Sequence, residues 1–367
     1  MGLWKFLAAA NIAKMKAAVL NERKVELDVQ EYPDPVLTPG SAIVKVLAAP
    51  VVHHYTSVFS GEIPFPLVLP FIPGCSAIGE IEEVGPDAHN LKKGDLVYVD
   101  PTIRTRDDPH SPETILQGLF LPPGNLSDVF RNGGFAEKML VPIENAVAIP
   151  SSLGRNAAKL TSINRLLVPY GGFLSGNFQP GETVLLLGGT GYYGACGVGI
   201  ALAMGARRVV LPGRSIEKLE AIVKKFGNRV VPVQLSEDEQ ENIVAFNRAA
   251  DGPIDLVLEL LEATAPMSII RSAIMSLRAF GTGVFMSGRA DNLELPFMPI
   301  MVKSLTIKGC FMYPRTASKK LLGLMEAGLL DPDWFDTDDQ YSLDSVNEAV
   351  QSAKKTSGPF AITVIVN

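Results

Sequence analysis

Three glycines, Gly189, Gly191 and Gly194, have the spacing G-x-G-x-x-G, between an apolar run and an apolar segment of small residues. The run from Thr183 to Leu187 is typical of a strand that is buried on both faces of a parallel sheet. After such a strand, these glycines allow a tight turn, a close approach of the backbone to a pyrophosphate, and close packing of a helix. The N–H groups at the start of that helix then face the phosphates. The pattern predicts a dinucleotide-binding turn; the alternative is a glycine-rich turn without a ligand.

The next expected strand ends without the acidic residue that would bind a ribose 2′-hydroxyl. In NAD-binding domains, an Asp or Glu about 20 residues beyond the glycines has this role. Here the sequence reads Leu-Pro-Gly213-Arg214-Ser215. Arg214 can hold a 2′-phosphate bidentately, Ser215 can donate its hydroxyl, and Lys218 lies on the same helix face as Arg214. We therefore expect NADP(H) as the cofactor; the alternative is that Arg214 is an ordinary surface arginine.

Composition argues against several other classes of protein. The formal net charge is −6 and no dense run of Lys and Arg occurs, which argues against binding to nucleic acid or to an anionic membrane. No apolar run approaches the ~20 residues needed to span a bilayer. The three cysteines, Cys75, Cys196 and Cys310, are far apart in sequence and fit a reducing compartment. We expect a cytoplasmic protein that acts on a small molecule.

The length of 367 residues predicts about two domains. Residues 15–149 contain short apolar runs separated by turn residues, which predicts a partly closed β-barrel. Within them, residues 100–134 form a polar, proline-rich excursion, typical of a lid or a partner surface. Residues 1–14 are expected to be a packed or frayed extension before the fold begins at Met15; the alternative is a short amphipathic helix or a weak targeting segment.

Beyond Gly181, strands and helices alternate, which predicts a doubly wound parallel sheet. Strands are expected at 208–211, 230–233, 256–260, 284–287 and 304–308, and helices at 216–226, 237–250, 267–277, 317–327 and 343–354. A last strand at 360–366 lies outside the alternation, and we expect it to return to the first domain.

Several motifs, in order, resemble the medium-chain dehydrogenase/reductase superfamily, which includes alcohol dehydrogenases and quinone oxidoreductases. They are Gly74…Gly79…Val84-Gly85…Gly94-Asp95-Leu96-Val97, Phe178-Gln179-Pro180-Gly181-Glu182-Thr183-Val184 with the glycines, Asp255–Glu259, Ser304–Gly309 and Gly358–Val366. The resemblance implies an α/β protein with a GroES-like β-barrel catalytic domain, residues 15–158 completed by 316–367. A Rossmann domain, residues 159–315, would bind NADP(H), and the active site would lie in the cleft between the two domains.

The sequence departs from the zinc-dependent members of that superfamily. Val52 stands where they have a cysteine ligand, and Gly74-Cys75-Ser76 replaces their Gly-His-Glu. A catalytic zinc needs three Cys, His or carboxylate ligands. The four closely spaced cysteines of a structural zinc lobe are also missing from residues 100–134. We therefore predict no metal.

Reduction of a simple ketone produces a localised alkoxide, which zinc would stabilise as a Lewis acid. Reduction of an enone or quinone produces an enolate or phenolate, which hydrogen-bond donors alone can stabilise. We expect hydride transfer to a conjugated C=C bond or a quinone. His54 and Tyr55 are the candidate catalytic residues, on the loop that replaces the zinc-binding turn; the alternative is that they pack the cleft wall. Further cofactor contacts are expected from a set of residues near the glycines and the nicotinamide: Thr190, Tyr192, Tyr193, Ser287 and Phe311. The two tyrosines cover the cofactor or pack.

Two other functions remain open at this stage. One is a zinc-free, NADP-dependent alcohol or carbonyl dehydrogenase on the same scaffold. The other is a non-catalytic NADPH-binding sensor. The superfamily often dimerises, so a homodimer is expected.

Overall fold

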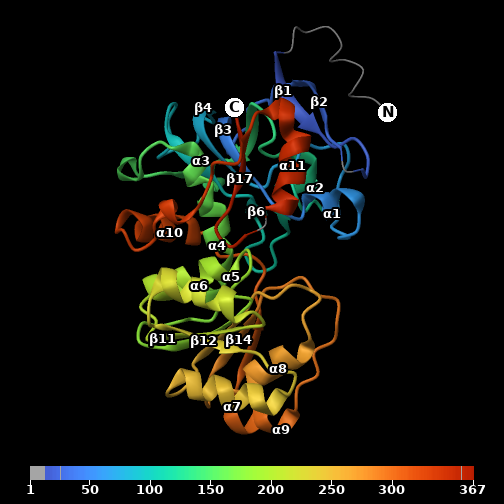
Figure 1. Ribbon diagram of the computed structural model, residues 1–367. Helices are drawn as coiled ribbons and strands as arrows, with labels where there is room; N and C mark the ends of the chain where they lie inside the picture. Colours follow the sequence, from blue (N-terminus) through green and yellow to red (C-terminus); the bar gives the residue numbers. More distant parts are fainter. Residues whose placement is uncertain (1–12, 25, 357) are drawn as a thin grey trace. The chain divides into compact units, whose positions relative to one another are not determined.

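The computed structural model describes residues 13–24, 26–356 and 358–367, which form two compact units (Figure 1). Unit 1 contains the described residues up to Ser162, together with 335–356 and 361–367, and unit 2 contains 163–334 and 358–360. Most of the N-terminal extension, residues 1–12, lies outside the described residues.

These units differ from the expected domain ranges, chiefly at the boundary expected after residue 315, which lies after residue 334 in the structure. Residues 316–334 belong to unit 2, because the Trp334 ring meets the Phe226 ring edge-on, with centroids 5.2 Å apart. Gly358–Phe360 also belong to unit 2, because the Arg165 guanidinium donates to the Gly358 carbonyl.

Unit 1 is built around the long strand β3 (Ser41–Val51), most of whose residues are buried. One edge of β3 pairs with β4 (Ala77–Val84); the other pairs with β8 (Lys138–Pro142) and with β17 (Thr363–Val366). The predicted return of the C-terminal strand to this domain is therefore confirmed. The remaining strands of unit 1 are β1 (Lys14–Val19), β2 (Asp28–Pro33), β5 (Leu96–Val99), β6 (Thr102–Arg104), β7 (Thr114–Leu116), β9 (Ala146–Ala148) and β16 (Gln340–Tyr341).

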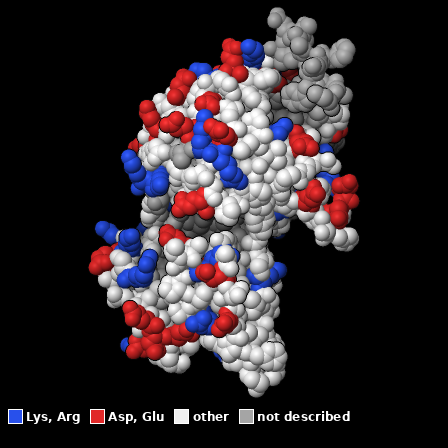
Figure 2. Space-filling view, turned by 90° about the vertical axis from the view of Figure 1, so that its right-hand side faces the viewer, with Lys and Arg blue, Asp and Glu red and all other residues white. Residues whose placement is uncertain are grey.

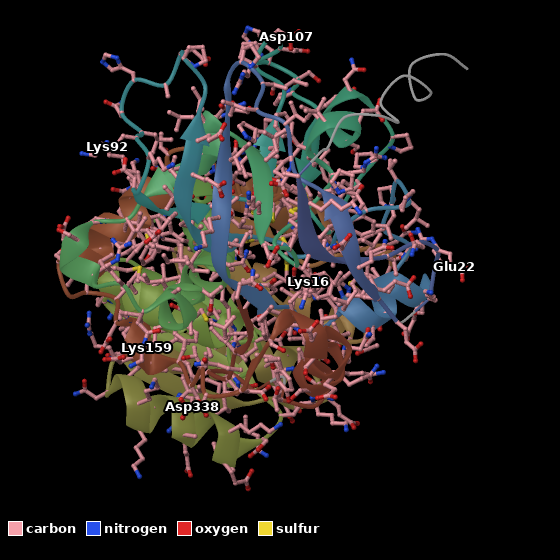
Figure 3. All side chains as sticks on the ribbon, turned by 90° about the horizontal axis from the view of Figure 1, so that it is seen from above. Lys16, Glu22, Lys92, Asp107, Lys159 and Asp338 are labelled. Carbon is pink, nitrogen blue, oxygen red and sulfur yellow. The ribbon has the colours of Figure 1, made fainter. Side chains whose placement is uncertain are left out.

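The excursion at residues 100–134 contains a β6–β7 hairpin and the short helix α2 (Asn125–Phe130). Its tip is exposed, and Asp107 lies at the outer rim of the unit, as does Lys92 of a neighbouring loop (Figure 3). Where it rejoins the barrel, the Gly134 N–H donates to the Gly74 carbonyl at 2.9 Å. A Cβ on Gly74, whose φ is +112°, would lie 2.5 Å from the Gly134 nitrogen, so this contact needs glycine.

Short helices complete unit 1. They are α1 (Tyr55–Ser60), α3 (Ala157–Leu160) and α11 (Val346–Lys355), with 3₁₀ turns at Ile143–Asn145, Ser151–Leu153 and Leu343–Ser345. Helix α4 (Ser162–Ser175) begins at Ser162, where the first segment of unit 1 ends, and its other residues belong to unit 2.

Unit 2 contains a six-stranded sheet in the order β12-β11-β10-β13-β14-β15, with every pair parallel. This is the strand order of a doubly wound Rossmann sheet, as predicted. Helices α5 and α6 cover one face and α7 and α8 the other (Figure 1). The strands are β10 (Thr183–Leu187), β11 (Arg208–Gly213), β12 (Val230–Gln234), β13 (Leu256–Glu259), β14 (Thr282–Phe285) and β15 (Thr306–Gly309). The helices are α5 (Gly194–Ala203), α6 (Ile216–Phe226), α7 (Glu239–Ala250), α8 (Met267–Met275), α9 (Phe297–Lys303) and α10 (Ala317–Glu326), with a 3₁₀ turn at Pro332–Trp334.

Local sequence explains where these helices begin and end. Helix α6 starts after Ser215, whose hydroxyl accepts the Lys218 N–H, and ends before Gly227. Helix α7 starts after Asp238, whose carboxylate accepts the Glu241 N–H. Helix α9 was not predicted; Pro296 precedes it and Pro299 lies in its first turn, where a missing N–H is tolerated.

The surface carries charges of both signs. Figure 2 shows one face, on which acidic and basic side chains are interspersed and no continuous basic region is visible. Among the helices of the described residues, none has the length and apolar composition to cross a membrane.

Candidate functional site

The glycine loop, residues 188–194, joins the carboxyl end of β10 to α5. Gly188 has a φ of +82°, and the Gly191 N–H donates to the Gly188 carbonyl at 2.8 Å, which closes a tight turn. A Cβ on Gly189 would lie 2.0 Å from the Leu211 side chain. Gly189 therefore packs directly on the Leu211 side chain of β11, whereas a Cβ on Gly191 would lie 3.1 Å from the Gly188 carbonyl oxygen.

Gly194 begins α5 and packs directly on this turn. A Cβ there would lie 2.1 Å from the Gly188 carbonyl oxygen and 2.7 Å from the Gly189 Cα. The helix begins beside the carboxyl ends of β10 and β13, where the strand order reverses. Open parallel sheets bind dinucleotides at such a point. The structure thus brings the predicted glycines together with a geometry that fits the ligand.

The residues between the glycines are only partly exposed. The Tyr192 and Tyr193 rings meet edge-on with centroids 4.9 Å apart, and Tyr193 caps α5. Thr190 is half-buried in the turn. The Arg165 guanidinium lies 3.5 Å from the centre of the Tyr192 ring. Of the two expected roles, the structure therefore shows the packing role of Tyr192. Arg165 was missed in the sequence, since no local pattern links it to the glycine loop.

The β11–α6 turn holds the residues expected to read the ribose. Gly213 is buried at the end of β11, whereas Arg214 and Lys218 are exposed. The Ser215 hydroxyl donates to the Glu217 carboxylate at 2.7 Å and accepts the Lys218 N–H at 3.3 Å. The bond from Ser215 lowers the pKa of Glu217 below its usual value. Glu217 was missed in the sequence, although its place in the first turn of a helix is typical of an acidic residue.

A buried carboxylate joins the ends of β13 and β14. Glu259 is 1% exposed and accepts three hydrogen bonds, from the Leu261 N–H at 2.9 Å, the Ser287 N–H at 3.2 Å and the Ser287 hydroxyl at 2.7 Å. The predicted Ser287 therefore has its hydroxyl proton committed to Glu259. Phe311, two residues beyond β15, is 57% exposed. Both follow strands of the same parallel sheet as the glycine loop, so they lie at its carboxyl edge.

The predicted catalytic residues lie in unit 1, His54 in the turn before α1 and Tyr55 as the first residue of that helix. His54 caps this helix and is half-buried, with its ring centroid 5.1 Å from that of His53 and 6.4 Å from that of Phe65. Burial, and then the charge of His53, lowers the pKa of His54 to about 3. The ring is therefore neutral at neutral pH, and the catalytic role predicted for His54 stays a prediction.

Tyr55 does not have the environment expected of a proton donor. Its side chain is 0% exposed, stacks on Phe59 with centroids 5.0 Å apart, and meets Phe135 edge-on. Its hydroxyl accepts the Cys75 N–H at 2.6 Å inside unit 1. Tyr55 thus fixes the turn that contains Cys75, and the catalytic role predicted for Tyr55 stays a prediction.

The positions that hold zinc in related enzymes do not present a ligand set here. Val52 is buried and cannot ligate. Burial, and then the charge of Asp100, raises the pKa of the Cys75 thiol to about 12, while the buried Ser76 hydroxyl has no hydrogen-bond partner. Across residues 13–24, 26–356 and 358–367, no three His, Cys, Asp or Glu side chains are grouped so that they could hold a metal ion. These residues do not fit a catalytic zinc.

Two family models match the chain, one for each kind of domain. The alcohol dehydrogenase GroES-like domain matches residues 38–151, and the zinc-binding dehydrogenase family matches residues 194–327. The sorbitol dehydrogenase of Bacillus subtilis is 26% identical over 92% of this chain and 93% of its own length. A zinc-type alcohol dehydrogenase-like protein of Schizosaccharomyces pombe is 28% identical over 89% of this chain and 91% of its own.

Solved structures share the fold. The crystal structure of AibC matches with a TM-score of 0.79 at 22% identity, over 97% of this chain and 96% of that one. The fold and the glycine loop define a dinucleotide-binding protein of two domains, one a GroES-like barrel and one a Rossmann domain. The chain belongs to the medium-chain dehydrogenase/reductase superfamily, a superfamily of oxidoreductases.

Proposed function

We propose that the protein is a zinc-independent, NADP(H)-dependent oxidoreductase that transfers a hydride to a conjugated C=C bond or a quinone. The observation that carries this proposal is the donor set where related enzymes hold zinc: a buried valine, a protonated thiol and a serine hydroxyl. When bound, the nicotinamide supplies the hydride. The chain's own residues then bind the cofactor and stabilise charge on the reduced substrate.

The substrate class follows from how that charge is stabilised. Reduction of a simple ketone concentrates charge on one alkoxide oxygen, for which a Lewis acid is the strong stabiliser. Reduction of an enone or quinone spreads the charge, so hydrogen-bond donors suffice. A neutral His54 can supply one ring N–H to such an oxygen, and its lowered pKa keeps it in that form at neutral pH.

The preference for NADP(H) rests on Arg214, which is exposed at the end of β11. Its planar guanidinium matches the 2′-phosphate bidentately. Glu217 opposes this preference, because its carboxylate repels a phosphate and can accept a hydrogen bond from the 2′-hydroxyl of NAD(H). The Arg214→Asp variant should therefore lose NADPH affinity and keep NADH affinity, whereas Glu217→Gln should shift the balance towards NADPH.

Both affinities can be measured by fluorescence titration. Arg248→Asp is the matched control, since it makes the same charge change on the exposed surface of α7. An equal loss of both cofactors in Arg214→Asp, with none in Arg248→Asp, would refute a 2′-phosphate contact.

The activity can be tested with the purified protein, treated with EDTA, and a panel of quinones, enones, aldehydes and ketones. Consumption of NADPH with enones or quinones, unaffected by the chelator, is the expected result. Turnover with simple carbonyls alone would support a zinc-free alcohol or carbonyl dehydrogenase, which the names of the relatives favour. Turnover abolished by EDTA would refute zinc independence. Tight NADPH binding without turnover of any compound would favour the sensor.

We propose a homodimer that forms at the open edge of the six-stranded sheet. The residues of β15 are all exposed, and this strand is the last in the sheet order. Helix α9 exposes Phe297, Met301 and Val302, at 78%, 52% and 67%. An identical strand can pair with this edge about a two-fold axis and cover these side chains. Met301→Glu should convert the dimer to a monomer in light scattering; an unchanged mass would refute this interface.

We also propose a cytoplasmic location. None of the three cysteines forms a disulfide. Burial raises the pKa of Cys196 to about 11 and that of Cys75 to about 12, so both thiols are protonated. Cysteines without disulfides are expected in a reducing compartment. Fractionation of cells that make the protein would test it.

A further inference from the structure

Arg165 is the largest of the almost completely buried side chains among the described residues, with 1% of its surface exposed. It lies in the first turn of α4, in unit 2. A buried guanidinium is costly unless its N–H groups are engaged. What it engages therefore indicates why the chain holds a charged side chain there.

Two backbone carbonyls accept hydrogen bonds from Arg165. Nε donates to the Tyr192 carbonyl at 2.7 Å, and Nη2 donates to the Gly358 carbonyl at 2.7 Å. The guanidinium also stacks on the Tyr192 ring, 3.5 Å from its centre. Arg165 thus holds Tyr192 by its backbone and its ring at once.

The Tyr192 carbonyl lies within the glycine loop, in the peptide group that leads to Tyr193. A trans peptide is planar, so its N–H points away from its carbonyl oxygen. By fixing the Tyr192 carbonyl, Arg165 fixes the direction of the Tyr193 N–H, at the N-terminal end of α5. N–H groups at this place are the ones that face a pyrophosphate.

The second carbonyl connects the loop to a distant part of the chain. Gly358–Phe360 is the segment of unit 2 that follows α11 and precedes β17 in sequence. The Phe360 ring packs on the Phe226 ring of α6 with centroids 6.0 Å apart, and Lys225 Nζ lies 4.5 Å from the centre of the Phe360 ring. Arg165 ties this segment to the glycine loop.

We propose that Arg165 is a positioning residue for the cofactor, which sets the glycine loop in its pyrophosphate-binding conformation and links that loop to Gly358–Phe360. The inference rests on the proposed binding of NADP(H). The planar fork of arginine has donors in fixed directions, whereas a lysine ammonium at the same place cannot reach both carbonyls with that geometry. Misplacement of a binding group by about 1 Å can reduce function about 100-fold.

The test compares two ligands that contact different parts of the site. NADPH needs the glycine loop, whereas adenosine 2′-phosphate carries no pyrophosphate and reports on the β11–α6 turn, which contains Arg214. Arg165→Lys should weaken NADPH binding by about 10- to 100-fold and leave the affinity for adenosine 2′-phosphate unchanged. The ratio of the two affinities is a readout that simple destabilisation would not move.

Arg207→Lys is the matched control. Arg207 also donates to carbonyls, those of Ala250 and Asp251, but it lies beside Thr183 at the other end of β10. This variant should leave the affinity ratio at the wild-type value even where its melting temperature falls. A second variant, Arg165→Met, removes the charge and should weaken NADPH binding at least as much. If it does not fold, Arg165→Lys, which keeps the charge and most of the volume, remains the informative variant.

Three results would overturn the inference. Wild-type affinity for NADPH in Arg165→Lys would refute it while leaving the proposed function intact. An equal loss of both ligands, in step with the melting temperature, would show that Arg165 is structural only. Failure of the wild-type protein to bind NADPH or NADH would instead remove the proposed function on which the inference rests.

Discussion

Substitution of Gly194 by alanine is the sharpest test of how closely α5 packs on the glycine loop, because the structure gives the size of the steric overlap. The new Cβ would lie 2.1 Å from the Gly188 carbonyl oxygen, whereas ordinary contact begins at 3.4 Å. The first turn of α5 and the glycine loop must therefore separate by about 1.3 Å. The atoms that it meets are backbone atoms, which cannot rotate away as a side chain can.

Two effects should follow from this separation. The free energy of unfolding should fall by about 1–3 kcal/mol, the usual cost of overpacking. The affinity for NADPH should fall by about 100-fold, since a displacement of about 1 Å is enough to misplace a binding group. Urea denaturation measures the first effect, and fluorescence titration of NADPH measures the second.

Gly323 provides the matched control for this experiment. It lies within α10, and a Cβ there meets nothing within 4 Å. Gly323→Ala should stabilise the protein by about 0.4–1 kcal/mol and leave NADPH binding unchanged. If Gly194→Ala kept both the stability and the affinity of the wild type, the close packing of α5 on the glycine loop would be refuted.

Three further predictions concern buried groups of the candidate site. Glu259→Gln keeps only one of the two acceptor oxygens of the side chain, so the free energy of unfolding should fall by about 1–3 kcal/mol. Cofactor binding should weaken as well, because Ser287 loses its acceptor. An unchanged urea midpoint would contradict this prediction. Tyr55→Phe should lower the free energy of unfolding by about 1–3 kcal/mol, because the Cys75 N–H loses its acceptor. The kcat should not change. A loss of kcat with normal stability would instead indicate that Tyr55 is a catalytic residue. His54 has a folded pKa of about 3, below its usual 6.5, so the free energy of unfolding should be full above pH 6.5 and fall as the pH drops from 6.5 towards 3. His54→Gln should flatten this pH dependence in urea melts, and an unchanged dependence would contradict the half-buried, neutral ring.

Much of the cofactor-binding half could be predicted from the sequence. Apolar strands alternating with amphipathic helices predict a parallel sheet, because each element must bury one face against the next. Gly194 carries its own signal, since a Cβ there would lie 2.1 Å from the Gly188 carbonyl oxygen, a backbone atom that cannot rotate away. Helix α6 matches its predicted bounds, because Ser215 and Gly227 mark both of its ends in the sequence.

The tertiary structure decided the roles of individual polar groups. Tyr55 and His54 were predicted as a pair by residue type, but the fold buries the tyrosine hydroxyl on the Cys75 N–H and suppresses protonation of the histidine. Whether a group titrates or donates depends on neighbours from distant parts of the chain, and no local spacing records them.

The same holds for the residues that sequence reasoning missed. Arg165 reaches Gly358, 193 positions away, and Glu259 reaches Ser287, 28 positions away. Local sequence determined the sheet and its glycine turn, since each depends on propensity and on nearby sterics. Only the folded chain determined which buried charges hold that turn and its neighbours in place, since a hydrogen bond depends on where two distant segments meet.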